Sequence, residues 1–574
     1  MNTEKKDISM LMRITPIVPL LVLAAWPPLV TFSQEPRKTE RTLLQDQPNC
    51  RVQIELVDAA SGSALPGVLR ALDKNGQRVA IPELMPRGLG VPEQLSIHDW
   101  YLLPMQTTVT LPRKILHLRA FHGLETEFTD TAIDLRNKTE AQVRLQLKRF
   151  HDAHGRGWQS ANTHVHLQKV SRSDSEKYLL DVANCEQLDI VYISYLERAE
   201  ADLEYTTNKY TRDDLRRLMQ RSRTSHSHPH SIWHGTEFDN GQEHRHNFDG
   251  FDEGYGHVMF LHLNELVQPV SIGPGITKRG TDSPPLQLGI DLARGQGSTI
   301  IWCHNQWGME DIPSWLAGKL HANNIFDGGT HGSFKYSFYR YLNAGLKVPF
   351  STGTDWFIYD FSRVYALADP RSLTGDKWLS SEQWLEHLAA GRTFITNGPL
   401  LEFTVNGHRL GDTLNLPHAG PVKILGRSVG RDDFQQIQLV RNGEVVKSAS
   451  SNPREGHFEA EFEFDLTIDA PCWLALRTPP PSVPKDAEFQ RKTPLNEFGR
   501  ELFSHTSAIY IHLAGRDIFD VSAAESLLEE MRSSRDLIRS RSLFSNDAER
   551  DGVLAIYDAG INQMEKNLKS RRIP

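Results

Sequence analysis

The sequence predicts an α/β fold in which a central strand–helix region is flanked by two β-rich regions and a helical tail. Three observations support this prediction. Apolar residues alternate with period two on both sides of the centre, short apolar runs alternate with helix-like segments within it, and the chain becomes amphipathic after Asp520. Period-two alternation is typical of half-buried strands, whereas strand–helix alternation indicates βα units in a largely parallel sheet or barrel.

The composition indicates a globular chain of several domains. Of its 574 residues, 39% are hydrophobic and 24% are charged, and this length exceeds a single ordinary core. The formal net charge of −8 argues against a nucleic-acid partner, because phosphate binding needs a basic surface. The cysteines form no C-x-x-C pair, so we expect isolated buried thiols rather than a disulfide or cysteine–zinc framework. They are Cys50, Cys185, Cys303 and Cys472.

The first residues have the pattern of a secretory signal peptide. Basic residues precede the short apolar run "IVPLLVLAAW", and "TFSQ" offers small residues for cleavage. This pattern is typical of secretory signals, and the run is short for a spanning helix. We predict a signal peptide over 1–33, with an uncleaved anchor as the alternative, and a secreted, periplasmic or cell-envelope location. No later segment is long and apolar enough to cross a bilayer.

Residues 45–150 and 397–515 are predicted to form two β-sandwich domains. In the first, "CRVQIELVD" and "AQVRLQLKRF" alternate strictly, with turn-rich pieces such as "DKNGQ" between them. In the second, "FQQIQLVRNGEVVKSA" predicts a hairpin with Asn442-Gly443 in its turn, and "HFEAEFEFDL" and "SAIYIHL" predict further strands. A helical tail over 520–574 follows, where Ser522 and Glu525 form a predicted capping box.

Between these regions, residues 156–396 alternate candidate strands with candidate helices. The buried-strand candidates are "LDIVYIS", "STIIWCH" and "LKVPFSTGTD", and the helix candidates are "EKYLLDVANCEQ", "TRDDLRRLMQRS" and "SSEQWLEHLAAG". Such alternation favours parallel βα units.

The first candidate site is the stretch "ANTHVHL". In a strand, His164 and His166 point to the same face, so two imidazoles from one strand end could hold one metal ion. The pattern alone is weak, because the chain has 24 histidines and H-x-H also occurs in "SHSHPH" and "EHRHN". An isolated pair of this kind is more often structural or exposed.

Four later residues strengthen the hypothesis. Glu237 lies in a Gly-Thr-Glu turn, His257 begins an apolar run, and His304 and Asp355 end two buried-strand candidates. In a βα barrel, the carboxyl ends of the strands form the active-site face. Each residue alone could be structural, but their recurrence at equivalent places predicts a shared site.

These motifs together resemble the PHP (polymerase and histidinol phosphatase) superfamily of metal-dependent hydrolases, and within it the CehA/McbA-like branch. The matching pieces are "THVH", "GTE", "GHVMFL", "IIWCH" and "TGTD", followed by "LAAGRTFITNGPLLEF". The resemblance covers about residues 156 to 405 and depends on the order and spacing of the motifs rather than on any one of them.

The resemblance implies a distorted (β/α)7 barrel that holds up to three metal ions. Carried over by position, one ion would be held by His164, His166, Glu237 and Asp355. A second would be held by Glu237, His257 and His304, with Glu237 bridging. The resemblance also implies catalytic roles for Asp355, as a proton acceptor, and for Glu237.

The departures from the family pattern all affect the third metal site. Asn162 replaces an expected Asp, Tyr195 and Leu196 replace an Asp-His pair, Phe357 replaces a His, and Arg172 stands near an expected ligand. We therefore expect a mono- or dinuclear centre. A degenerate barrel that serves as a metal-free scaffold is the alternative.

Neutral imidazoles and carboxylates suit Zn, Mn or Fe, and such ions activate water for hydrolysis. The resulting hypothesis is an exported hydrolase of a small-molecule ester, either a phosphoester or a carboxylic or carbamate ester. His234, in the histidine-rich tract, and Arg392 are weaker candidates for substrate binding; a solvated loop and a structural salt bridge are their alternatives. "EHRHN" is predicted to be a loop.

Two other functions remain open at this stage. The first is a non-catalytic binding module of the cell envelope, in which two β-sandwiches flank a decayed barrel. The second is an assembly protein joined through the helical tail. The sequence does not indicate an oligomeric state.

Overall fold

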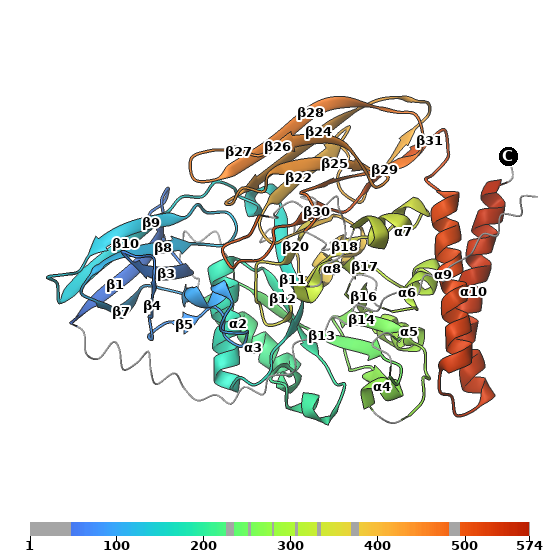
Figure 1. Ribbon diagram of the computed structural model, residues 1–574, viewed down its shortest axis with the longest axis horizontal. Helices are drawn as coiled ribbons and strands as arrows, with labels where there is room; N and C mark the ends of the chain where they lie inside the picture. Colours follow the sequence, from blue (N-terminus) through green and yellow to red (C-terminus); the bar gives the residue numbers. More distant parts are fainter. Residues whose placement is uncertain are drawn as a thin grey trace, which may run out of the picture. The chain divides into compact units, whose positions relative to one another are not determined.

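The computed structural model describes residues 48–224, 235–250, 254–277, 280–304, 308–329, 334–368, 378–481 and 494–572. Over these ranges the protein is a mixed α/β structure with one large curled sheet, smaller β-sheets and nine α-helices (Figure 1). Contacts group Pro48–Pro574 into one compact unit, separate from Met1–Gln47. The predicted signal peptide lies outside the described residues. In the described part, no helix combines the length and apolarity needed to span a membrane.

Two small sheets form the N-terminal β region. Their apolar faces pack on one buried cluster, to which Val52 and Leu118 belong, so the period-two alternation predicted for this region is confirmed. One sheet contains β1 (Asn49–Asp58), β2 (Ala64–Leu65), β7 (Thr107–Pro112) and β10 (Glu140–Leu147). The other contains β3 (Gly67–Asp73), β4 (Arg78–Val79), β5 (Met85–Pro86), β6 (Tyr101–Leu103), β8 (Ile115–Phe121) and β9 (Thr129–Asp134).

The large sheet curls until its pairings return to its first strand. Its curled part runs through β11 (Trp158–His166), β12 (Ile190–Tyr195), β13 (Glu237–His246), β14 (Gly256–Leu261), β16 (Thr299–Trp302), β17 (Ala322–Asn324), β18 (Phe350–Ser351) and β19 (Asp355–Trp356). Neighbours are parallel, except that β14 is antiparallel to both β13 and β16. The segment 350–356 closes the ring, because β18 pairs with β17 and β19 pairs with β11.

Six helices of the described residues join strands of this ring, and a seventh, α8, follows its last strand. They are α2 (Arg172–Glu186), α3 (Arg212–Thr224), α4 (Pro274–Thr277), α5 (Leu286–Gly295), α6 (Asp311–Leu316), α7 (Arg340–Asn343) and α8 (Ser381–Ala389). The three helix candidates of the central region correspond to α2, α3 and α8, so these predictions are confirmed. The start of α8 is stabilised by a capping box between Ser380 and Gln383.

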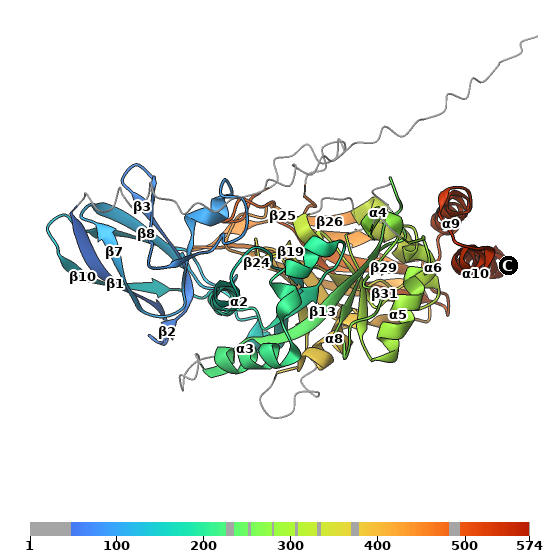
Figure 2. The ribbon, with the colours of Figure 1, turned by 90° about the horizontal axis from the view of Figure 1, so that it is seen from below.

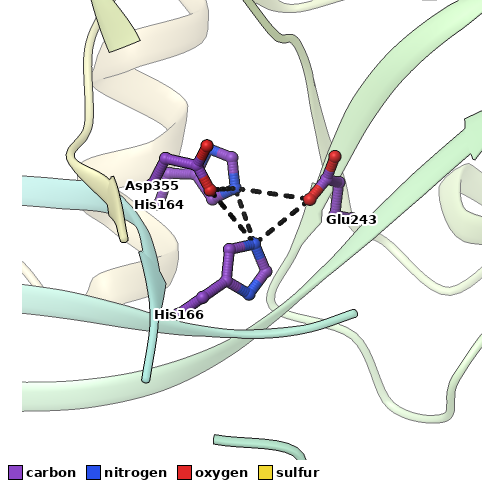
Figure 3. A group of neighbouring side chains, drawn as sticks. All are labelled: His164, His166, Glu243 and Asp355. Atoms are coloured by element: carbon purple, nitrogen blue, oxygen red, sulfur yellow. Dashed lines mark hydrogen bonds and ion pairs between the residues drawn. The ribbon is translucent and has the colours of Figure 1, made fainter. Parts of the chain in front are cut away.

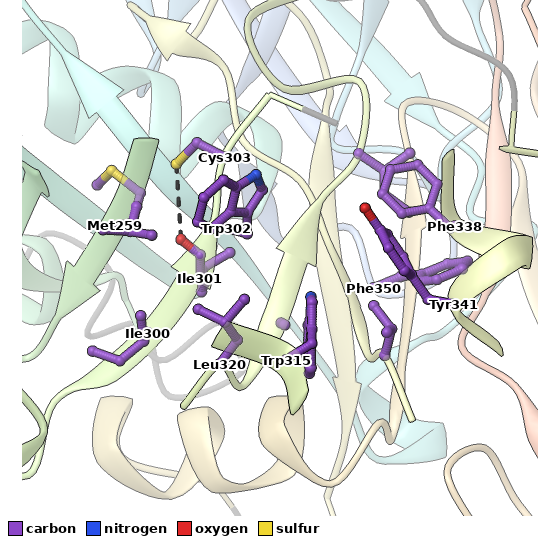
Figure 4. Packing of buried hydrophobic residues seen from close by; sticks show 14 of the residues in the cluster. Met259, Ile300, Ile301, Trp302, Cys303, Trp315, Leu320, Phe338, Tyr341 and Phe350 are labelled. Carbon is purple, nitrogen blue, oxygen red and sulfur yellow. Dashed lines mark hydrogen bonds between the residues drawn. The ribbon is translucent and has the colours of Figure 1, made fainter. Parts of the chain in front are cut away.

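The core of the ring is built from large apolar side chains that lie between β16 and the nearby helices. Trp302, Trp315, Tyr341 and Phe350 are all buried in this cluster (Figure 4). Trp302 ends β16, and the chain then passes through Cys303 to a candidate site residue. All four cysteines are free and buried, as the sequence predicts.

The large sheet continues across the predicted domain boundary at 396/397. After β20 (Arg363–Leu367), strand β21 (Thr393–Thr396) pairs with β30 (Ser504–Thr506). The sheet then includes β23 (Thr413–Leu416), β25 (Gln436–Arg441), β26 (Glu444–Ser450), β29 (Cys472–Arg477) and β31 (Ile509–Leu513), with the short β15 (Ser271–Ile272) at β13. A separate sheet contains β22 (Leu400–Val405), β24 (Gly420–Gly430), β27 (Asn452–Pro453) and β28 (Phe458–Ile468).

The predicted hairpin in this region is confirmed. Strands β25 and β26 pair around Asn442 and Gly443, which have φ angles of 53° and 95°. Positive φ at both central residues is what a tight two-residue hairpin turn requires, and Asn-Gly adopts it readily.

The tail forms two helices, α9 (Val521–Arg541) and α10 (Asp547–Arg572), which lie side by side next to α6 (Figure 2). The predicted capping residue is wrong: the Asp520 carboxylate, and not Ser522, caps α9 by accepting a hydrogen bond from the Ala523 N–H at 2.7 Å. Met531 and Tyr557 belong to the same buried cluster as Trp315 of α6.

Candidate metal centre

His164 and His166 lie at the carboxyl end of β11 and point to the same side of the strand (Figure 3). Both side chains are 0% exposed. Their Nε2 atoms are 2.9 Å apart, because residues two apart in a strand share a face.

The second nitrogen of each ring is held by a neighbour. His166 Nδ1 lies 3.0 Å from the Ser194 carbonyl oxygen, to which it donates, and His164 Nδ1 lies 2.7 Å from Asp327 Oδ2. Each Nδ1 therefore carries a proton, and each Nε2 can present its lone pair to the site. Hydrogen bonds of this kind fix the tautomer of metal-binding histidines.

Two carboxylates complete a group of four around these nitrogens. Glu243 Oε2 lies 3.8 Å from His164 Nε2 and 3.2 Å from His166 Nε2, and Asp355 Oδ1 lies 3.5 and 3.7 Å from the same atoms. A tetrahedral ion with bonds of 2.0–2.1 Å needs ligand atoms about 3.3 Å apart. The separations scatter around this value, so the four side chains fit one ion.

Glu243 also belongs to a second group. Its other oxygen, Oε1, lies 3.5 Å from His257 Nδ1, and His304 completes a set whose ligand atoms are all within 4.8 Å of one another. One carboxylate oxygen thus faces the first group and the other faces the second. This is the arrangement of a carboxylate that bridges two ions.

The curled sheet explains why these residues meet. The first group comes from β11, β13 and β19, which are parallel or linked through parallel neighbours. His257 is the second residue of β14. Because β14 is antiparallel to β13, its first residues lie at the end of β13, with His257 opposite Arg245. His304 follows β16 by two residues. All of these residues therefore lie at one edge of the ring.

The prediction for Glu237 is wrong. Glu237 is the first residue of β13, opposite Ile190, and its Oε1 accepts a hydrogen bond from the Ser381 N–H at 3.2 Å. Glu243 lies on the same face near the other end of this strand. At about 3.3 Å per residue the two are roughly 20 Å apart along it, so Glu237 is outside both groups.

The error has a structural cause. Strand β13 extends for ten residues and includes the first four residues of "EHRHN", for which the sequence predicts a loop. His244 and His246 are buried on the face opposite Glu243, where His244 Nδ1 lies 3.0 Å from the Val270 carbonyl oxygen and His246 Nε2 lies 3.0 Å from Asp282. The period-two spacing of Glu237, Asp239, Gly241 and Glu243 is the signal that could have identified the later carboxylate.

Of the two candidate substrate-binding residues, Arg392 is not part of the centre. The Arg392 carbonyl oxygen accepts from the N–H of Leu367, and Leu367 pairs with Trp158 at the start of β11. Arg392 therefore lies at the opposite end of this strand from His164. His234 lies outside the described residues.

The residues that depart from the family pattern have other partners in the structure. Asn162 Nδ2 donates to Thr354 Oγ1 at 2.8 Å, and its Oδ1 accepts from the His164 N–H at 3.2 Å. It therefore ties β11 to the segment that carries Asp355. Arg172 pairs with Asp214 at 3.0 Å.

The remaining departures are also accommodated. The Tyr195 hydroxyl donates to Glu197 at 3.2 Å, Leu196 is buried, and the Phe357 N–H donates to the His166 carbonyl oxygen at 2.8 Å. A further grouping consists of His164, Cys303 and Asp327, of which Asp327 contacts His164 through Nδ1.

The electrostatics of the centre favour a cation. Burial lowers the pKa of His164, but Asp327, Asp355 and Glu243 outweigh it and raise this pKa well above its ordinary value. Burial raises the pKa of Glu243, but Arg245 and the histidines hold it well below its usual range. Burial and Arg245 lower the pKa of His257. The negative field that attracts a proton to His164 would equally attract a metal ion.

The backbone at the centre is locally strained. His304 has a φ of 57° and Asp355 a φ of 59°, in the left-handed region that non-glycine residues adopt at some cost. The surrounding structure must hold these conformations. Such outliers cluster at functional sites.

Several residues beside the centre are not among the predicted site residues. Arg245 Nη1 lies 3.4 Å from Glu243 Oε1. The Trp356 ring lies 5.2 Å from the His166 ring, and the Arg198 guanidinium lies 5.5 Å from the centre of the same indole. Trp356 and Arg198 therefore lie beside His166, and Arg245 lies at the Glu243 oxygen that faces the second group.

No protein-family model matches the chain, and a search of curated proteins finds no match either. Three of the donors in the two groups are carboxylate oxygens and four are imidazole nitrogens, when the two Glu243 oxygens are counted separately. Such donors suit Zn, Mn or Fe and do not by themselves select one ion.

Proposed function

We propose that the protein is an exported, metal-dependent hydrolase of small-molecule esters, of the PHP superfamily and its CehA/McbA-like branch, with a dinuclear centre. The observation that carries this proposal is the position of Glu243. Its two oxygens face two different sets of histidines, which a residue with a purely structural role has no need to do.

The strand arrangement supports the barrel that this superfamily implies. The pairings pass through β11, β12, β13, β14, β16, β17 and the β18–β19 segment before they return to β11. Seven strand positions in a closed, irregular ring are compatible with a distorted (β/α)7 barrel. The β regions at 45–150 and 397–515 would then be the flanking sandwiches.

The roles of the residues follow from their geometry. His164, His166, Glu243 and Asp355 would hold one ion, and Glu243, His257 and His304 would hold the other. Bound ions of this kind supply Lewis acidity and lower the pKa of water. Asp355 is the most exposed of the six, at 8%, so its carboxylate is the one best placed to accept a proton from an incoming group.

The chain also orients its own ligands. Asp327 holds His164 through Nδ1, and the Ser194 carbonyl holds His166. Arg245 keeps Glu243 ionised, since its guanidinium lowers the pKa of that carboxyl. The substrate class that we propose is a phosphoester or a carboxylic or carbamate ester, and the signal-like segment at 1–33 supports export.

Metal analysis combined with a panel of chromogenic esters tests the proposal. The wild type is expected to contain up to two equivalents of divalent metal and to hydrolyse at least one ester, and a chelator should abolish this activity. Glu243→Ala should lose both ions and the activity, because it removes a ligand from each group. Glu237→Ala is the matched control, with the same change on the same strand face, and should keep both.

Two results would count against the proposal. A purified wild type that takes up no divalent metal would exclude the dinuclear centre. Metal bound with the expected stoichiometry, but without turnover of any phosphoester, carboxylic ester or carbamate, would favour the alternative of a binding module in the cell envelope.

A further inference from the structure

The loop that follows Asp355 is held from outside the ring by the N-terminal β region. Arg87, directly after β5, is 0% exposed and reaches this loop with its guanidinium. Its Nη1 donates to the Ile358 carbonyl oxygen, and its Nη2 donates to the Asp360 carbonyl oxygen at 3.5 Å. A side chain from a different sheet therefore binds the backbone three and five residues after a candidate metal ligand.

Arg87 is itself fixed by α2. Its Nε donates to Glu186, and its Nη1 donates to the Tyr178 hydroxyl at 3.3 Å. Tyr178 contacts the same loop, because its hydroxyl lies 3.1 Å from the Ile358 carbonyl oxygen and 3.2 Å from the Ile358 nitrogen. Arg87 thus completes a buried polar clamp around Ile358.

A second contact joins the same two parts of the chain. Gly90 has a φ of 82°, and a Cβ added there would lie 2.0 Å from the Phe357 ring. The Phe357 ring therefore rests directly on the Gly90 backbone. Phe357 also donates its N–H to the His166 carbonyl oxygen at 2.8 Å. The contact with Gly90 therefore restrains the backbone that connects to both Asp355 and His166.

The loop needs such support because of its backbone. Asp355 and Phe357 have φ angles of 59° and 53°, and residues in this region persist only when their surroundings hold them there. The β19 strand contributes only two residues to the pairing with β11. Contacts beyond the ring must therefore supply part of the restraint.

We propose that Arg87 is a positioning residue of the metal centre, which holds the 355–360 loop so that the Asp355 carboxylate meets His164 and His166. The N-terminal β region is then a structural component of the centre rather than a separate module. This inference rests on the metal site of the proposed function. Hydrogen-bond partners outside the ligand set typically change metal affinity by about 10- to 100-fold. We expect an effect of this size from Arg87, although it comes from a different part of the chain than the ligands.

Cobalt(II) titration of the metal-free full chain, followed by visible absorption, tests the inference, with urea unfolding measured in parallel. Arg87→Met should weaken binding of the ion held by Asp355 by about 10- to 100-fold and alter its absorption spectrum. It should also destabilise the fold, because it leaves Glu186 with less compensation. Arg363 also pairs with Glu186 at 3.5 Å, and both side chains are buried. The double variant Arg87→Met/Glu186→Gln therefore leaves Arg363 without this partner, so it should stay destabilised and should bind cobalt as weakly as Arg87→Met.

Arg431→Met is the matched control. Arg431 is also a buried arginine that connects the N-terminal β region to the rest of the chain: it donates to the Thr126 and Gly123 carbonyl oxygens and pairs with Glu497. None of these partners lies in the 355–360 loop. This variant should lose stability and keep the cobalt affinity and spectrum of the wild type.

The outcomes separate the two proposals. A wild type that binds no cobalt overturns the metal centre and this inference with it. A wild type that binds, with Arg87 variants of unchanged affinity and spectrum, overturns the inference alone. An equal loss of affinity in Arg431→Met would show that general docking of the β region matters and that Arg87 has no specific role.

Discussion

At the scale of single residues, the centre depends on side chains that are each constrained on two sides. Glu243 faces one set of imidazoles with each oxygen, and His164 is held through Nδ1 by Asp327 while its Nε2 faces His166. Such double constraint costs conformational freedom and is expected where a site must be rigid before a ligand binds.

His505, which lies away from the centre, is a buried histidine that should make the free energy of unfolding depend on pH. It lies on β30, where its Nδ1 is 2.7 Å from the Thr506 carbonyl oxygen and its Nε2 is 2.7 Å from the Tyr339 hydroxyl. Burial and the charge of Arg477 lower its pKa to about 3. The folded protein therefore keeps His505 neutral, whereas the unfolded chain protonates it near pH 6.5.

The sign of the effect follows from this depressed pKa. The stability contributed by neutral His505 is complete above pH 6.5 and is lost as the pH falls from 6.5 towards 3. At pH 5 the loss should be about 2 kcal/mol relative to pH 7.5. Urea unfolding of the wild type and of His505→Gln at both pH values checks this: the variant should lose about 2 kcal/mol less on acidification. Equal losses would contradict the prediction.

At the scale of elements, close backbone approach places β11 against the segment that carries Asp355. Gly353 lies in the turn between β18 and β19, and a Cβ added there would lie 2.6 Å from His164 Cβ and 2.9 Å from its backbone nitrogen. Only glycine allows this approach. The turn closes the ring at the point where its first and last strands supply ligands.

Gly353→Ala should therefore push β18–β19 away from His164. We expect a loss of about 1–3 kcal/mol in the free energy of unfolding, as for other overpacked sites, together with weaker binding of the ion held by His164 and Asp355. Thermal unfolding and metal titration check both effects. Gly420→Ala is the control, since a Cβ at that position meets no atom within 4 Å; similar behaviour of the two variants would contradict the argument.

At the scale of the whole molecule, the helical tail is part of the main core. The apolar face of α9 and α10 packs on the same buried cluster as α6 and the ring, and Arg340 of α7 pairs with Glu530 of α9. The apolar face of the tail, which the sequence offers for assembly, is therefore buried against the protein's own core.

Met531→Ala tests whether the tail unfolds together with the rest. Met531 is 0% exposed, so its truncation should cost about 2–5 kcal/mol of global stability. Glu529→Ala, on the exposed face of the same helix with a side chain 72% exposed, should change stability by less than about 0.5 kcal/mol. If Met531→Ala leaves the main unfolding transition unchanged, the tail is an independent unit.

The elements of the central region were largely predictable from local pattern. The strands and helices expected from "LDIVYIS", "STIIWCH", "EKYLLDVANCEQ" and "SSEQWLEHLAAG" are present. They were predictable because the spacing of apolar residues shows which side of an element faces the core. The extent of β13 was not predicted: its second half is polar in sequence, so only the period-two spacing indicates it, and contacts from distant segments such as Val270 and Asp282 bury it.

Spacing along the chain is enough to predict that His164 and His166 share a strand face and that His257, His304 and Asp355 lie next to buried strands. Contacts between distant segments place Glu243, and not Glu237, between the two groups, and bring an arginine of the N-terminal β region to the Asp355 loop. For the carboxylate, strand register makes the difference. A carboxylate lies at this edge of the ring only if it is near the end of its strand. The end of β13 is set by its pairing with β12 and β14 rather than by the neighbouring sequence.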